Sequence, residues 1–346
     1  MTFENRVEEI MSQITAFSVK EYTRTDYLPE LLKLQKETVD LTFNAEQGDN
    51  TDLRLWDVER HLRKMNEERG HIADEELDRF VKGCKTVCNN ISAEFSGRRG
   101  EQIVFKALEN LACQNKVLHN VELEFDGRRT EIDALVFTNH AVFIIEIKNS
   151  KKNIFIDSNG EFFRNGHSMH YDCNIADKMN ERESMLRKTL ERAGMEYLKI
   201  FKIVTFTNSR IDVENKYRYI KVCGVNYLST FIEKFTSRQW YTYEDMCIMS
   251  EAVTEAKCPD EYLMTIDMNE FKRDFAVLMA KLEASEETEN EPDTVKEMHE
   301  RAEKTADNEP VKKKQNDHKY GKGVAAAVGI TLVNVAIVGF SRLLKR

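Results

Sequence analysis

Residues 126–149 read DGRRTEIDALVFTNHAVFIIEIKN, and the expected fold of the chain follows chiefly from their pattern. Two runs rich in β-branched and aromatic residues flank the short connection TNH, which predicts a β-hairpin. Side chains alternate between the two faces of a strand, so Asp133 is expected to share a face with Glu131. By the same period, Glu146 and Lys148 share a face of the second strand. The hairpin therefore predicts that Asp133, Glu146 and Lys148 lie side by side.

These three side chains are the types that a phosphodiester-cleaving site requires. Two carboxylates bind a hard divalent cation such as Mg²⁺ or Mn²⁺ and leave positions for water and phosphate. A lysine beside them can orient or deprotonate the attacking water, or stabilise charge on the phosphate. Glu101 can reach the group from a preceding helix, where it shares a side with Val104 and Phe105. The simpler alternative is a surface ion pair between Glu146 and Lys148.

The order of three motifs resembles the NERD, or nuclease-related, domain, which is found mainly in bacteria. The motifs are GRRGE at 97–101, DGRRTEIDALVF at 126–137 and AVFIIEIKN at 141–149. The resemblance covers roughly residues 96–230 of the chain. It implies a restriction-endonuclease-like core of the PD-(D/E)XK superfamily. It also implies that Asp133, Glu146 and Glu101 bind the metal and that these three and Lys148 are catalytic.

The helix after the hairpins departs from the family pattern. Where the family carries Asn-Pro and then Gln, this chain has Asn174-Ile175 and then Lys178, which puts the contact of this helix with substrate in doubt. We expect this charge-rich helix to run from about Ala176 to Ala193. Another helix is expected to start at Gly97. The runs VLHNVELEF, IFID, EFFR, FKIVTFTN and IKVCGVNYL are expected to be strands, with a turn at Asp126-Gly127 after the first of them.

The rest of the chain reads as helical regions on either side of this domain. Residues 1–95 have helical periodicity, with one helix expected to begin at Pro29, and carry no chemical motif. We expect a packing or partner-binding module there. Residues 231–282 return to helix, and residues 283–322 read as a charged linker. Within the central domain helices and strands alternate, which predicts a mixed α/β fold with a mixed sheet flanked by helices.

Charge is distributed unevenly along the 346 residues. The formal net charge of −9 excludes a protein that binds nucleic acid by being basic throughout. Gly97 to Val222 nevertheless carry 21 Lys and Arg against 18 Asp and Glu, whereas the remainder carries 30 against 42. Six basic residues flank the motifs and are candidates for phosphate-backbone contacts, with ordinary solvated charge as the alternative: Arg98, Arg99, Arg128, Arg129, Lys151 and Lys152.

The C-terminal segment GVAAAVGITLVNVAIVGF, at 323–340, contains no charged residue. Eighteen residues span about 27 Å as a helix, close to the thickness of a bilayer core. We therefore expect residues 323–341 to be a single-pass membrane anchor that holds the protein on the cytoplasmic side of the membrane. The alternative is a buried helix in a soluble cytoplasmic protein. Small residues spaced four apart in this segment favour contact between helices in a membrane, so a homo-oligomer is a further alternative.

These patterns predict a Mg²⁺- or Mn²⁺-dependent nuclease, tethered to the membrane, that hydrolyses phosphodiester bonds in nucleic acid, with DNA as the expected substrate. The alternative is a catalytically inactive, nuclease-derived binding module that assembles a complex at the membrane. A protein partner of the N-terminal helices fits either function. Sequence preference, and the choice between single and double strands, do not follow from these residues.

Overall fold

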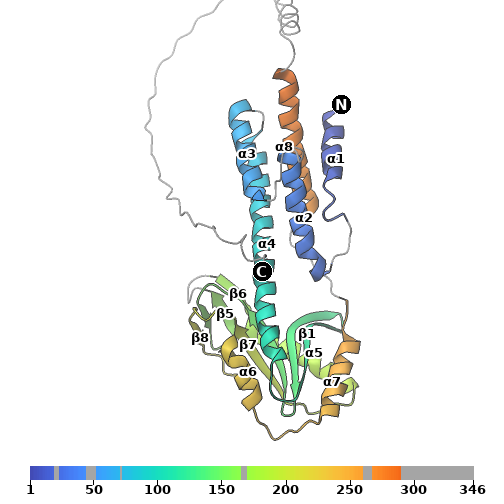
Figure 1. Ribbon diagram of the computed structural model, residues 1–346, viewed down its shortest axis with the longest axis vertical. Helices are drawn as coiled ribbons and strands as arrows, with labels where there is room; N and C mark the ends of the chain where they lie inside the picture. The colour runs from blue at the N-terminus through green and yellow to red at the C-terminus, as the bar shows by residue number, and fades with distance from the viewer. Residues whose placement is uncertain (19–22, 44–51, 71, 165–169, 260–266, 290–346) are drawn as a thin grey trace, which may run out of the picture. The chain divides into compact units, whose positions relative to one another are not determined.

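The computed structural model describes residues 1–18, 23–43, 52–70, 72–164, 170–259 and 267–289 (Figure 1). The described residues all belong to one compact unit, and residues 290–346 lie outside them. The described helices are α1 (Phe3–Gln13), α2 (Arg24–Phe43), α3 (Leu55–Arg69), α4 (Asp74–Glu109), α5 (Ile175–Arg192), α6 (Val225–Lys234), α7 (Tyr243–Ala256) and α8 (Met268–Glu289). The described strands are β1 (Asn115–Phe125), β2 (Arg128–Thr138), β3 (Val142–Lys148), β4 (Ile154–Ile156), β5 (Glu161–Arg164), β6 (His170–Asn174), β7 (Ile200–Phe206), β8 (Val213–Asn215) and β9 (Lys221–Gly224).

The larger sheet confirms the predicted mixed α/β fold. Within the described residues it has five strands in the order β1-β2-β3-β7-β9. β1, β2 and β3 pair antiparallel, as the hairpin pattern predicted, whereas β3 pairs parallel with β7 and β7 parallel with β9. The parallel pairing requires the crossover that α5 supplies between β3 and β7.

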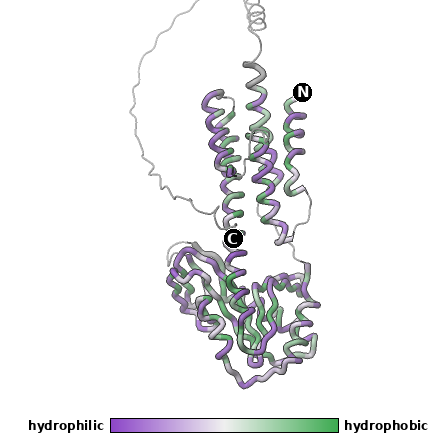
Figure 2. The backbone as a smooth tube through the Cα atoms, in the orientation of Figure 1, coloured by the Kyte–Doolittle hydropathy of each residue, from purple (hydrophilic) through white to green (hydrophobic). Residues whose placement is uncertain are grey.

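Alternate residues of β3 enter two different hydrophobic cores. Val142 and Ile144 pack in a core that includes residues of α5 and α7, here called the α5-side core. Phe143 and Ile145 pack in a core that includes residues of α4 and α6, here called the α6-side core. Because both faces of the strand are covered, its sequence is continuously apolar rather than alternating. Figure 2 shows this as hydrophobic colouring along the central strands.

The smaller sheet was only partly predicted. Its strands follow the order β6-β5-β4-β8 in the described part of the chain. The runs IFID and EFFR were expected to be strands and form β4 and β5. β6 and β8 were not expected, because strands of three to five residues are too short to show a hydrophobic period. The rings of Phe162 and Phe206 stack with centroids 6.4 Å apart and connect the two sheets.

The helix α4 corrects the prediction that a new helix starts at Gly97. It runs unbroken from Asp74 to Glu109 and passes through that glycine (Figure 1). Its first half packs with residues of α1, α2, α3 and α8, and its second half enters the α6-side core through Val104 and Leu108. A glycine costs a helix interior only about 1 kcal/mol relative to alanine, and the burial of both halves outweighs that cost.

Two further boundaries differ from the predictions. α2 begins at Arg24 rather than at Pro29, because the Asp26 carboxylate accepts hydrogen bonds from the Thr23 backbone and hydroxyl groups and caps the helix earlier. The run IKVCGVNYL is a strand only as far as Gly224, and its second half opens α6. Leu228 and Ile232, four residues apart, are buried on one side of that helix, which favours helix over strand.

Each helix in the described part of the chain is too short or too polar to span a lipid bilayer. The predicted anchor, residues 323–341, and most of the predicted linker, residues 283–322, lie outside the described residues.

Candidate active site

Asp133 and Glu146 lie at the point where β2 and β3 part. The antiparallel pairing of these strands extends from Phe137 and Val142 to Ala134 and Ile145, and the two acidic residues come one step beyond it. There the Asp133 Oδ2 atom accepts a hydrogen bond from the Ile147 N–H at 2.7 Å. A side-chain oxygen thus takes the place of a strand partner, which fixes the carboxylate against the end of β3.

Three basic side chains contact Glu146 among the described residues. Its Oε1 atom is 2.8 Å from Lys148 Nζ and 3.2 Å from Lys178 Nζ. Its Oε2 atom accepts a short hydrogen bond from Arg182 Nη1. Arg182 Nη2 also donates to Asp133 Oδ1 at 3.3 Å. The structure therefore brings the predicted trio of Asp133, Glu146 and Lys148 together, and it adds two cations that the sequence analysis did not assign to the site.

The helix α5 places these two cations because they are four residues apart, on one side of the helix. Its first turn is capped by Asn174, whose Oδ1 accepts the Asp177 N–H at 3.0 Å. Lys178 occupies the position where the family resemblance led us to expect Gln.

A signal for Arg182 was present in the sequence. It falls on the stripe of Ile175, Met179 and Leu186, all of which are buried in the α5-side core. An arginine on an apolar stripe requires a buried anionic partner, because an unpaired buried charge is too costly.

The environment shifts the pKa values of the two carboxyl groups in opposite directions. Burial and the charge of Glu146 raise the pKa of Asp133 to about 6, although Arg182 favours its ionised form. Burial also disfavours the charged form of Glu146, but Arg182, Lys148 and Lys178 outweigh it and hold the pKa of Glu146 below its ordinary value. Burial opposes the charge on Lys148, but contact with Glu146 prevails and raises the pKa of this lysine. Lys148 is therefore a cation at neutral pH.

Glu101 lies with different partners from those of the trio. Its Oε1 atom accepts a hydrogen bond from Arg24 Nη2 at 2.6 Å, and Arg24 Nη1 also contacts Glu131. These three residues line a cavity of about 580 Å³ between α2, α4 and β2. Glu131 and Asp133, predicted to share a face, thus have separate partners. No cluster of three or more His, Cys, Asp or Glu side chains in the described part of the chain could hold a metal ion.

The motif Gly-x-x-Gly-Glu has a packing role that the structure explains. A Cβ atom on Gly100 would lie 2.8 Å from Asn149 Cβ, so only glycine lets α4 approach the end of β3 this closely. Asn149 in turn donates from Nδ2 to the Ser96 carbonyl at 2.8 Å. The contact fixes the end of the strand that carries Lys148.

The six candidate backbone-binding residues divide into two groups. Arg98 donates to the carbonyl groups of Arg24 and Thr25, and Arg129 donates to Glu122 at 2.8 Å, so both have partners within the protein. The other four are exposed, namely Arg99, Arg128, Lys151 and Lys152. Arg128 and Lys178 line one cavity of about 720 Å³, which therefore adjoins the site through a residue that contacts Glu146.

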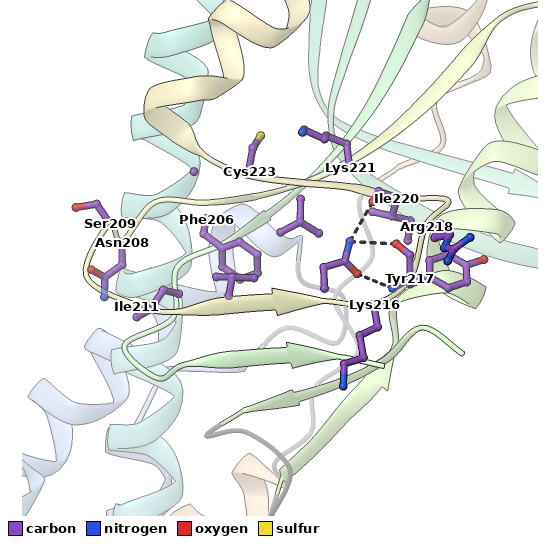
Figure 3. A pocket seen from close by; sticks show the side chains of 14 residues that line it. Phe206, Asn208, Ser209, Ile211, Lys216, Tyr217, Arg218, Ile220, Lys221 and Cys223 are labelled. Atoms are coloured by element: carbon purple, nitrogen blue, oxygen red, sulfur yellow. Dashed lines mark hydrogen bonds between the residues drawn. The ribbon is translucent and has the colours of Figure 1, made fainter. Parts of the chain in front are cut away.

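A third cavity, of about 680 Å³, begins where β7 ends (Figure 3). Phe206, which lines it, pairs with Lys148 in the sheet, and the Lys148 Nζ atom lies 5.8 Å from the centre of the Phe162 ring that stacks on Phe206. The charged residues among its described lining are all basic, namely Lys216, Arg218 and Lys221. In Figure 3 Lys216 and Lys221 project in opposite directions, and Arg218 lies at one end.

The carboxylates of Asp133 and Glu146, where the pairing of β2 and β3 ends, are suited to a hard divalent cation. Two carboxylates from adjoining strands offer oxygen ligands, which Mg²⁺ and Mn²⁺ prefer. Asp133 Oδ1 and Glu146 Oε2 accept hydrogen bonds from two nitrogens of one guanidinium, so both oxygens face the same position. Asp133 and Glu146 fit such an ion, and Arg182 occupies the position between them.

Comparison with known proteins confirms the family resemblance for this part of the chain. Residues 96–207 match the model of the NERD family, the nuclease-related domain. This family is grouped with the PD-(D/E)XK superfamily. The match includes both carboxylates, Lys148 and the helix that carries Arg182. No curated protein and no solved structure matches the chain.

Proposed function

We propose that this protein is a metal-dependent nuclease that hydrolyses phosphodiester bonds in nucleic acid, with DNA as the expected substrate. One observation carries the proposal: Asp133, Glu146 and Lys148 lie together where the pairing of β2 and β3 ends, inside a domain related to nucleases. The Glu146 side chain is 2% exposed and that of Asp133 15%, and carboxylates with so little exposure need cationic partners, a metal ion or a functional role to retain their charge.

Asp133 and Glu146 are the residues that would hold Mg²⁺ or Mn²⁺. When bound, such a cation lowers the pKa of a bound water and offsets charge on the phosphate. Lys148 is a cation held 2.8 Å from Glu146, so we assign it the role of stabilising negative charge on the phosphate rather than that of a general base. Glu101 stays a predicted additional ligand, and it could serve as one only after leaving Arg24.

One cavity supports a nucleic-acid substrate. The charged residues in the described lining of the cavity that begins where β7 ends are all basic, whereas the cavity of Arg128 and Lys178 also carries Lys188 and three acids, Asp126, Asp177 and Glu181. Basic side chains around a site attract the phosphate backbone without reading its sequence. We propose that the substrate strand extends from Asp133 and Glu146 into the basic cavity, and that Arg99, Arg128, Lys151 and Lys152 add outer contacts with its backbone.

A second candidate function has a specific observation in its favour. Both carboxylates are already paired with Arg182, and a buried, fully paired cluster can serve as structure alone. The domain would then be an inactive, nuclease-derived binding module, with the helical regions recruiting a protein partner. This function predicts no metal-dependent cleavage under any condition.

The membrane anchor at residues 323–341 is also a proposal, supported by the uncharged stretch alone. Full-length protein and a form ending at residue 322 would be compared by sedimentation with phospholipid vesicles. We expect only the full-length form to sediment with the vesicles. Equal recovery of both forms in the supernatant would contradict an anchor. Size-exclusion chromatography of the same two forms tests whether the tail drives homo-oligomerisation.

The nuclease is tested with the full chain and three substrates: supercoiled plasmid, single-stranded DNA and RNA, each with Mg²⁺, with Mn²⁺ or with EDTA. We expect metal-dependent cleavage that falls by about 100-fold or more in Asp133→Ala and in Lys148→Ala, because each removes a group that acts on the phosphate or its metal. Lys106→Ala/Glu109→Ala, on the exposed side of α4, is the matched control and should cleave normally. No cleavage of any substrate by wild type, or equal cleavage by all variants, would reject the proposal.

A further inference from the structure

The Arg182 guanidinium occupies the position between the two proposed metal ligands. Nη1 donates to Glu146 Oε2, and Nη2 donates to Asp133 Oδ1. The arginine is 1% exposed, so it has no contact with bulk solvent that could replace these partners. It is among the largest side chains that are completely buried in the described structure.

Every oxygen of the carboxylate pair already accepts a hydrogen bond. Glu146 Oε1 faces Lys148 and Lys178, and its Oε2 faces Arg182. Asp133 Oδ1 faces Arg182, and its Oδ2 accepts the Ile147 N–H. A carboxylate oxygen can accept more than one partner, but a divalent cation shared by Asp133 Oδ1 and Glu146 Oε2 would take the position of the Arg182 guanidinium, which is the donor that spans both acids.

The three basic side chains that contact Glu146 differ in how easily each could move away from it. Lys178 is 41% exposed, so its ammonium group can move into water. Lys148 is on the same strand as Glu146 and contacts only that member of the pair. Arg182 is buried, and its Nε atom has no hydrogen-bond partner among the described residues. The arginine is therefore held at this position by the two carboxylates, and its charge opposes any metal ion placed between them.

We infer that Arg182 is a resident counter-ion that competes with the metal for Asp133 and Glu146. The metal-free protein is the Arg182-bound state, and a divalent cation binds by displacing the guanidinium from the pair. Arg182 is thus a positioning residue, which keeps two buried carboxylates together in the absence of metal and weakens the affinity of the site for the ion. This inference rests on the proposed function, because it takes Asp133 and Glu146 as metal ligands.

The test measures Mn²⁺ binding to the full chain by titration calorimetry, without nucleic acid. Arg182→Met keeps the length of the buried side chain and removes its charge. We expect it to bind Mn²⁺ about 10- to 30-fold more tightly than wild type, because even a water-like dielectric gives a divalent ion a penalty of that size near a guanidinium. Lys178→Met is the matched control, and solvent screening should limit its gain to about threefold.

A second variant and a second readout are needed because Arg182→Met leaves buried acids less well paired. Arg182→Lys retains the charge but cannot bridge two carboxylates in the bidentate way of a guanidinium, so it should also bind Mn²⁺ more tightly than wild type. Thermal unfolding gives the independent readout. Saturating Mn²⁺ should raise the melting temperature of both Arg182 variants by more than that of wild type, because the ion replaces the lost counter-charge.

Equal Mn²⁺ affinity in wild type and both Arg182 variants would overturn the inference, and so would weaker binding in those variants. The outcome is separable from that of the nuclease. Wild type that cleaves DNA while its Arg182 variants gain no affinity would retain the nuclease and reject the counter-ion. If the Arg182 variants gain Mn²⁺ affinity but the protein cleaves no substrate, the inference that Arg182 is a counter-ion stands and the proposed nuclease activity is rejected.

Discussion

On strand β2, Glu131 and Asp133 each share an arginine with a second carboxylate, and the surroundings of these two clusters differ. Arg182 joins Asp133 and Glu146, with side chains 1%, 15% and 2% exposed. Arg24 joins Glu101 and Glu131, with side chains 29%, 13% and 33% exposed. The pairing chemistry is the same, but the electrostatic energy of a charge pair increases as solvent is excluded. We therefore expect the buried cluster to dominate stability and metal affinity, and the outer cluster to contribute little.

The two clusters also differ in which parts of the chain they connect. Arg182 comes from the crossover helix α5, within the NERD-matched segment, whereas Arg24 comes from the first turn of α2 in the helical region. The outer cluster is therefore a contact between the helical region and the domain. It retains Glu101, a predicted catalytic residue, at a separate cavity.

The largest predicted effect is the loss of stability in Arg182→Met. Without metal at pH 7, it leaves Asp133 and Glu146 buried with one cation fewer, and removal of one member of a buried ionic cluster costs about 3–5 kcal/mol. Urea denaturation of the full chain in EDTA measures the difference. The double variant Asp133→Asn/Arg182→Met, in which one charge of each sign is removed and Glu146 keeps Lys148 and Lys178 as partners, should recover much of the loss. A loss below about 1 kcal/mol would make the buried cluster equivalent to the outer one.

The next effect concerns the close contact between Gly100 on α4 and Asn149, which follows β3. Gly100→Ala forces a Cβ atom against Asn149 and should cost about 1–3 kcal/mol, as overpacking does. Gly97 is three residues earlier on the same helix and has nothing within 4 Å of an added Cβ atom. Gly97→Ala should instead stabilise by about 0.5–1 kcal/mol, because alanine favours helix. Opposite signs in thermal or urea unfolding confirm the close approach, and equal signs contradict it.

The pH dependence of stability sharpens the difference between the acids. A carboxyl group whose pKa rises to about 6 on folding stabilises the fold fully below its unfolded pKa, and that stabilisation is lost as the pH rises through the folded value. In EDTA, wild type should therefore lose stability relative to Asp133→Asn between about pH 4 and pH 6, by at most about 1.4 kcal/mol per pH unit. Glu146 has a lowered pKa and acts in the opposite direction, so the comparison uses the single Asp133 variant. Parallel pH profiles of the two proteins would exclude a raised pKa.

The smallest predicted effect is that of Arg24→Met. The ion pairs of the outer cluster are partly exposed, so the substitution should cost no more than about 1 kcal/mol, and 1 M NaCl should reduce the difference further. The same measurement on Arg182→Met should depend much less on salt. If Arg24→Met costs as much as Arg182→Met, solvent exposure does not separate the two clusters.

Much of the central domain could be predicted from local patterns. The alternation in TEIDALVF and the apolar run before Glu146 predicted β2 and β3, because strand periodicity is a property of neighbouring residues. The same periodicity could not predict β6 and β8, which are too short, or the passage of α4 through Gly97, which depends on two separate cores. It also placed Glu131 beside Asp133, whereas their partners belong to different helices.

Local pattern is enough to bring Asp133, Glu146 and Lys148 together, because they belong to two consecutive strands whose register follows from a short connection. Which cations complete the site depends on packing between distant elements. Arg182 reaches the pair because α5 packs across β2 and β3 with its apolar stripe inward, and Glu101 meets Arg24 because α2 packs beside α4. Contacts of this kind join residues far apart in the chain, and they depend on which faces of separate elements are buried together.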